Sequence, residues 1–316
     1  MRVSSPHAES GRVTRSRSCS RLPVTRRSGA LMVLGAGVMF SFGSLFFRAT
    51  DTLDAWQYLT FRGYGAFGVV LPVLWFQNRG DLGAIARRVE VRHVLAGLIL
   101  SAMMIAFIVS LTYTDTAFIL LFQAAGPISA AVFSWVLLGE RMSRDARIAA
   151  AAAVLGVVIM VSGGVDAGMG WAILIVLIIP LGIGLYGTLV RSAATIDPLA
   201  PVVIAGFMVG SVGLVISLMG PGFDVAARDV AIALLAGVAL IALPLPFFNH
   251  AQKVVPAPEA TLLLMSEIVL GPFWVWLFLG ETASVNTLIG GIVLLAAIAG
   301  NALSGKRRRP PPITSP

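Results

Sequence analysis

The chain has 316 residues, of which 57% are hydrophobic and only 12% are charged. A soluble domain carries about 25% charged residues, so the composition excludes a water-soluble enzyme and indicates a protein surrounded by lipid. The formal net charge of +8 does not indicate nucleic-acid binding, because 11 of the 23 lysines and arginines lie in the two chain tails. Cys19 is the only cysteine, which rules out an internal disulfide.

Ten apolar stretches follow a basic N-terminal segment. Residues 1–28 are rich in Arg and Ser, and we expect a disordered cytoplasmic tail there, although a transit peptide would have a similar composition. Residues 305–316 form a second basic tail. A membrane-spanning helix needs about 20 apolar residues. The sequence therefore predicts an all-α polytopic membrane protein with ten transmembrane helices, at about 30–48, 55–76, 93–112, 116–138, 147–164, 169–190, 199–219, 230–250, 257–279 and 286–304.

The distribution of basic residues predicts how the chain is oriented. When the N-terminus is placed in the cytoplasm, 20 of the 23 lysines and arginines fall in the inner segments. The outer segments hold only Arg48 and Arg228, and Arg62 falls within the second stretch. Because cytoplasmic loops are enriched in Lys and Arg, we expect a multi-pass protein of the bacterial inner membrane with both termini cytoplasmic.

Two segments of the chain resemble each other at an offset of 141 residues. Residues 133–140 (FSWVLLGE) align with residues 274–281 (WVWLFLGE), and these segments end the fourth and the ninth stretch. The repeat unit is therefore five helices, at 29–165 and 166–304. Since an odd number of crossings reverses the second copy, the sequence predicts two inverted five-helix repeats, an arrangement typical of transporters. Glu140 and Glu281 are interpreted as helix-end residues with structural roles.

Several segments resemble the EamA branch of the drug/metabolite transporter superfamily. The resemblance rests on the paired ends LLGER and FLGET, on FRGYG in the second stretch, on YTDTAFILLFQAAGP before the fourth, and on AQKVVPAPEATLLLMSEIV before the ninth. Ile268 directly follows Glu267, where the family often has proline, and Pro272 comes four residues later. The resemblance implies an inner-membrane carrier for small metabolites, with a central cavity lined by the first four helices of each repeat.

Arg62 and Glu267 are the two ionisable residues expected deep in the membrane. Arg62 lies about 10 Å from the outer end of its helix and Glu267 about 15 Å from the inner end of its own, so their levels differ by only about 5 Å. Arg62 is suited to a substrate carboxylate or phosphate, and Glu267 to a substrate amine or a coupling proton. The alternative is a structural ion pair that fixes helix packing and contacts no substrate.

Other polar residues are candidates because they share a helix face or a depth with this pair. Gly37, Ser41, Ser44 and Arg48 recur at helical spacing on one face, although small residues at such spacing also serve close helix packing. Tyr58 lies one turn from Arg62, where an interfacial aromatic belt is the alternative. The predicted substrate-binding residues are Arg62, Glu267, Gln123, Trp274, Tyr58, Asn249 and Ser44.

These features predict a secondary-active exporter of small metabolites such as amino acids, working by alternating access. Pro180, Pro244 and Pro246 are interpreted as bending points. The sequence contains no HExxH, Walker A, CxxC or GxSxG motif and only three histidines, so no enzyme activity, cofactor or metal is expected. The expected partners are a small-molecule substrate, the lipid bilayer and a coupling proton, and a homodimer is compatible with the sequence. The alternative is a membrane-embedded enzyme or an assembly partner that transports nothing.

Overall fold

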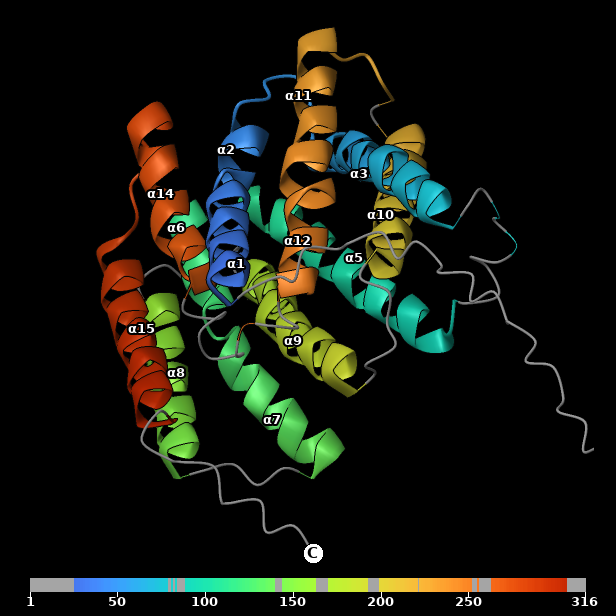
Figure 1. Cartoon of the computed structure of the whole chain (residues 1–316). Helices are drawn as coiled ribbons and strands as arrows, with labels where there is room; N and C mark the ends of the chain where they lie inside the picture. Colours follow the sequence, from blue (N-terminus) through green and yellow to red (C-terminus); the bar gives the residue numbers. More distant parts are fainter. Residues whose placement is uncertain are drawn as a thin grey trace, which may run out of the picture.

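A computed structural model of the chain describes residues 26–78, 81, 83, 89–139, 144–162, 170–192, 199–220, 222–251, 255 and 263–305. All regular structure in these ranges is helical. The predicted tails lie almost entirely outside the described residues. Figure 1 shows the helices, which are α1 (Arg26–Ser41), α2 (Gly43–Arg48), α3 (Ala55–Gln77), α5 (Val91–Leu111), α6 (Thr116–Gln123), α7 (Gly126–Leu138), α8 (Arg144–Ser162), α9 (Gly170–Ser192), α10 (Ala200–Met219), α11 (Ala227–Gly237), α12 (Pro244–Ala251), α14 (Ser266–Leu279) and α15 (Val285–Gly305).

Most of the helical segments are long and apolar enough to cross a membrane. Within the described ranges, seven candidate spans run from 27–48, 55–77, 91–111, 116–137, 171–189, 200–219 and 227–251. Three shorter apolar helices, at 147–162, 266–279 and 285–297, overlap the remaining predicted stretches. The protein is therefore a multi-pass helical membrane protein, while the number of ten crossings stays a prediction.

Three of the predicted spans are interrupted. The first divides at Phe42 into α1 and α2, and the fourth divides at Ala124–Ala125 into α6 and α7. The eighth consists of α11, a π-helical turn at Val238–Ala242 and α12, where the Leu243 N–H donates to the Val238 carbonyl oxygen at 3.0 Å. Prolines at 244 and 246 lack an N–H, which explains why regular helix geometry is lost there. By contrast, α9 continues through Pro180.

The helix packing repeats itself between the two halves of the chain. Helix α1 packs against α12 and α14, and the corresponding helix of the second half, α9, packs against α5 and α7. Two further pairs, α3 with α10 and α8 with α15, each join equivalent helices, and the second pair lies side by side in Figure 1. Gly139 and Gly280 end equivalent helices with φ of 68° and 70°. Both LGE segments thus use glycine for the same left-handed turn.

Glycines allow the equivalent helices to approach closely. A Cβ on Gly156 of α8 would lie 2.7 Å from the carbonyl oxygen of Gly290 on α15, and a Cβ on Gly206 of α10 would lie 3.0 Å from the carbonyl oxygen of Gly63 on α3. Small residues at such positions bring helix backbones together, and in lipid this packing takes the place of the hydrophobic effect. The two halves are therefore joined by backbone contact at both pairs.

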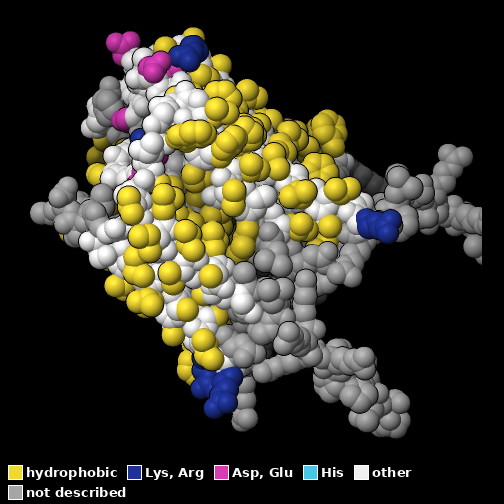
Figure 2. All heavy atoms as spheres, turned by 90° about the vertical axis from the view of Figure 1, so that its left-hand side faces the viewer, with side chains coloured by type: hydrophobic (Ala, Val, Ile, Leu, Met, Phe, Trp, Pro, Cys, Tyr) yellow, Lys and Arg dark blue, Asp and Glu magenta, His cyan; other side chains and the backbone are white. Residues whose placement is uncertain are grey.

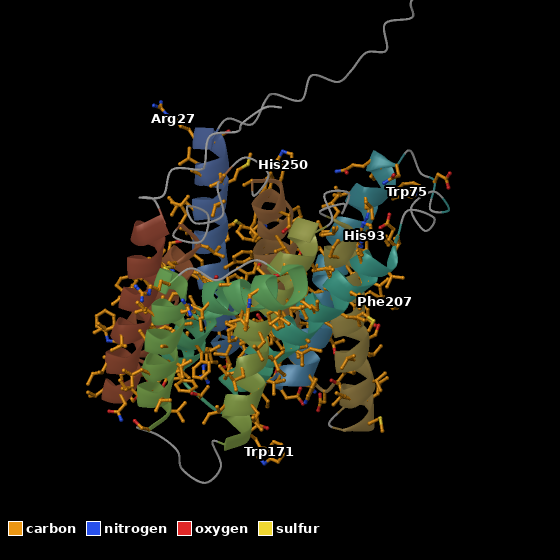
Figure 3. The ribbon with its side chains drawn as sticks, turned by 90° about the horizontal axis from the view of Figure 1, so that it is seen from below. Arg27, Trp75, His93, Trp171, Phe207 and His250 are labelled. Carbon is orange, nitrogen blue, oxygen red and sulfur yellow. The ribbon has the colours of Figure 1, made fainter. Side chains whose placement is uncertain are left out.

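The surface and the helix ends agree with a membrane-embedded molecule. Figure 2 shows hydrophobic side chains over most of the described surface in that view, with charged side chains confined to its margins. In Figure 3, Arg27 at the start of α1, Trp75 near the end of α3, His93 near the start of α5 and His250 near the end of α12 lie toward one edge. Trp171, near the start of α9, lies at the opposite edge. Helices that cross a bilayer in alternating directions have their ends arranged in this way.

Candidate functional site

Arg62 is held in position because the backbones of two neighbouring helices pack closely against α3. Next to it on α3, Gly63 packs against α10, and a Cβ on Gly65 would lie 2.5 Å from the carbonyl oxygen of Leu234 on α11. Gly237 of α11 packs directly against the backbone of Arg62 itself. The FRGYG segment thus places the arginine between two tightly packed helices. The Arg62 residue is only 5% exposed.

Three other predicted site residues lie around this arginine. Tyr58, one turn earlier on α3, is fully buried beside Arg62. Glu267 in the first turn of α14 is 7% exposed and also interacts with the Arg62 charge. The Glu267 carboxylate is hydrogen-bonded by the side chain of Gln123 at the end of α6. Arg62, Tyr58, Glu267 and Gln123 therefore form one polar cluster, which we call the central site.

Several donors in and near the central site have no protein acceptor. Within the described part of the chain, Arg62 Nε and Nη1 and the Tyr58 hydroxyl are buried without a hydrogen-bond partner. Arg62 and Glu267 form no ion pair within 4.0 Å there. A buried donor without an acceptor costs about 1–3 kcal/mol. The arrangement therefore differs from a closed structural ion pair, because these buried donors have no acceptor among the described residues.

Ser44 and Ser266 are further buried hydroxyls close to the helices of the central site. The Oγ atoms of both residues have no hydrogen-bond partner within the described residues. Ser44 lies on α2, where the neighbouring Phe47 packs edge-on against the Tyr58 ring, with centroids 5.0 Å apart. Ser266 immediately precedes Glu267 and lies against Gly37 of α1. No sequence pattern singles out Ser266, and its position directly before Glu267 is the only signal that points to it.

Trp274 makes a hydrogen bond and a stacking contact with other residues of the protein. Its indole N–H donates to the Ser41 Oγ at 3.0 Å, and its ring stacks on Phe42 at a centroid distance of 5.0 Å and an angle of 13°. Gly271, one turn earlier on α14, lies against the backbone of Ser41. The face of small residues on α1 therefore packs against α14. Trp274 fixes this packing, and both its polar atom and one ring face are used in doing so.

Asn249 contacts a residue that is not part of the central site. Its side chain is hydrogen-bonded to Tyr186, which belongs to α9. This bond connects the end of α12 with α9, two helices that are distant in sequence. Tyr186 was not selected from the sequence, because a tyrosine within an apolar helix resembles ordinary core. The structure thus brings together Arg62, Tyr58, Glu267 and Gln123, and places Asn249 with a different partner.

Ionisable side chains from two similar halves of a helical bundle, buried between them, define a membrane protein of the transporter class. Comparison with known families agrees: the EamA-like transporter family matches residues 27–162 and 170–303, and the chain belongs to this family. This confirms the resemblance found in the paired helix ends. A search of curated proteins gives no match. A solved structure described as "Crystal structure of protein" has a TM-score of 0.61 and 17% identity, covers 90% of this chain and 99% of its own, and supports the fold alone.

Proposed function

We propose that this protein is a secondary-active transporter of the bacterial inner membrane that exports small zwitterionic metabolites, such as amino acids, by alternating access. The proposal includes ten transmembrane helices in two inverted repeats, with both termini cytoplasmic. Its support is the family membership, the repeated helix packing and the confinement of basic residues to one set of loops. The central site belongs to a single chain, so the proposal requires no second copy.

The observation that carries this proposal is the set of buried donors at Arg62 and Tyr58 without an acceptor among the described residues, together with an acid, Glu267, whose charge interacts with Arg62 from the opposite half of the chain. A substrate carboxylate would accept from Arg62 and the Tyr58 hydroxyl, while the substrate amine would lie at Glu267. Gln123 would hold the Glu267 carboxylate in place. The substrate and the site each sum to zero charge, which limits the cost of about 2.5–3.5 kcal/mol for a charge within the membrane.

Glu267 also offers a route to coupling with a proton gradient. When the amine leaves, the buried carboxylate loses its counter-charge, and binding a proton restores neutrality. Substrate amine and proton would then compete for the same carboxylate. A proton arriving from outside would displace the substrate to the outside, and release of that proton to the inside would free the carboxylate for the next substrate, which is an exchange mechanism for export.

Flux in proteoliposomes tests the proposal. The purified protein is first screened for thermal stabilisation by amino acids, nucleotide sugars and cationic drugs, and uptake of the stabilising compound is then measured with and without a pH gradient. Arg62→Gln should lower its binding affinity by about 10- to 100-fold, because a hydrogen bond to a charged group contributes about 1.5–3 kcal/mol. Arg228→Gln is the matched control, because Arg228 pairs at 3.0 Å with Asp51 in an exposed ion pair.

Two results would overturn the proposed site or the proposed function. Full flux in the double variant Arg62→Glu with Glu267→Arg would mean that the two charges only hold each other in place. Absence of flux for every compound class, together with product formation in detergent, would indicate a membrane-embedded enzyme instead.

A further inference from the structure

An ion pair joins the two halves of the chain at a distance from the central site. Arg48 Nε lies 3.2 Å from Glu281 Oε2, and the two side chains are 30% and 22% exposed. Arg48 is the last residue of α2, in the first half, and Glu281 follows the end of α14, in the second half. In the proposed topology both residues are on the outer side of the membrane.

The same carboxylate also binds the start of a third helix. Glu281 Oε1 accepts from the backbone N–H of Thr116, the first residue of α6, at 2.6 Å. Arg48 Nη2 in turn donates to the Thr114 carbonyl oxygen at 3.1 Å. The left-handed turn at Gly280, with φ of 70°, sends the chain from the end of α14 toward Glu281. Arg48, Glu281 and the segment Thr114–Thr116 thus form a closed ring of polar contacts, which we call the outer latch.

The outer latch forms part of the wall of an open cavity. A surface cavity of about 490 Å³ is lined by Arg48, residues 111–115 and Glu281. Arg62, Tyr58 and Glu267 do not line this cavity, and they are buried. Phe47, directly before Arg48, is itself buried and packs edge-on against the Tyr58 ring. The latch residues therefore line the open cavity, and α2 connects them to the packing around Tyr58.

The helix that carries Arg48 is a short segment, set off from α1 by a single residue. Helix α2 has six residues and is divided from α1 at Phe42. Ser44, one turn before Arg48 on the same helix, is 1% exposed and its Oγ has no hydrogen-bond partner within the described residues. A movement of α2 about this division would withdraw Phe47 from Tyr58 and expose Ser44 at the same time.

We propose that the outer latch is the gate on the outer side of the transport pathway, and that its rupture releases α2 and opens the central site to the outside. The inference rests on the proposed transport function and adds the residues that control access. The structure has the latch closed. Each opening of the gate requires the Arg48–Glu281 pair to separate and the N-terminus of α6 to lose its carboxylate.

Thiol labelling tests the gate without any substrate. In a Cys19→Ser background, Ser44→Cys provides a single thiol, and a membrane-impermeant charged thiol reagent is added outside intact cells. Glu281→Gln should raise the labelling rate about tenfold, since couplings of this kind shift conformational equilibria by about 5- to 150-fold. Arg228→Gln, which removes an exposed outer arginine, should leave the rate unchanged. An unchanged rate in a monodisperse Glu281→Gln protein, or an equal rise in the Arg228→Gln control, would overturn the proposal.

Cross-linking provides the complementary test. The variant Arg48→Cys with Glu281→Cys, in the Cys19→Ser background, is cross-linked by a short bifunctional thiol reagent that contains a reducible bond. Flux should fall at least about tenfold and should return on reduction, because the gate is locked and then released. Undiminished flux in a fully cross-linked sample would overturn the gate. If the parent protein carries no flux, the transport function fails, whereas labelling still reports whether the latch opens.

Discussion

Replacing Gly237 with alanine should damage the central site although the residue carries no side chain. A Cβ at this position would lie 2.8 Å from the Ala66 backbone nitrogen and closer still to the Arg62 carbonyl oxygen. The optimal separation of non-bonded carbon atoms is about 3.5–4.0 Å, so α11 must shift away from α3 by more than about half an ångström. Backbone atoms cannot rotate aside as a flexible side chain can. The variant should therefore displace Arg62 or separate the two helices.

The expected loss of stability in Gly237→Ala follows from overpacking in a close-packed core, which costs about 1–3 kcal/mol. For a chain of this size the midpoint of thermal unfolding in detergent should fall by about 2–6 °C. Binding of the substrate identified in the screen should weaken in the same variant. Alanine is favoured over glycine within a helix by about 1 kcal/mol, so the measured loss understates the clash.

Gly68→Ala is the matched control for this variant. Gly68 also lies within a helix, α3, but a Cβ there would meet no described atom within 4 Å. This variant should be neutral or should unfold at a slightly higher temperature. If Gly237→Ala were as stable as the parent and bound substrate normally, the backbone contact between α3 and α11 would be refuted.

Three further predictions concern residues outside the central site. Trp274→Phe keeps the stacking on Phe42 but loses the hydrogen bond to Ser41, so thermal unfolding should show a loss of about 0.5–1.5 kcal/mol. Asp229→Ala should lower the unfolding temperature, because the buried carboxylate accepts from the Thr52 N–H and the Thr52 hydroxyl, both at 2.8 Å, and an unchanged temperature would contradict this clamp. Burial, together with the nearby Glu281 charge, raises the pKa of Asp115 above its ordinary 3.8, so the folded protein holds this proton more tightly than the unfolded chain. Stability should therefore fall as pH rises from about 3.8 through the folded-state pKa, and Asp115→Asn should flatten that fall in a pH series of unfolding curves.

The sequence by itself was sufficient to predict the class of protein and to identify the principal charged residues. Apolar stretches of span length show that lipid surrounds the chain, because no aqueous fold accommodates so much apolar surface. The paired LGE segments identify the repeat, and the family comparison confirms the resemblance they carry. Arg62 and Glu267 stand out because a charge within an apolar stretch is costly and needs a reason to be there.

Tertiary structure decided which partner each of these residues has. The sequence does not indicate that Gln123 binds Glu267, that Asn249 binds Tyr186, or that Trp274 donates to Ser41. Glu281 contacts Thr116 across 165 positions of the chain, and its role as a latch depends on that contact. Hydropathy indicates only which segments lie within the membrane. The choice of neighbour depends on how helices pack laterally, and here glycines at the helix contacts determine that packing.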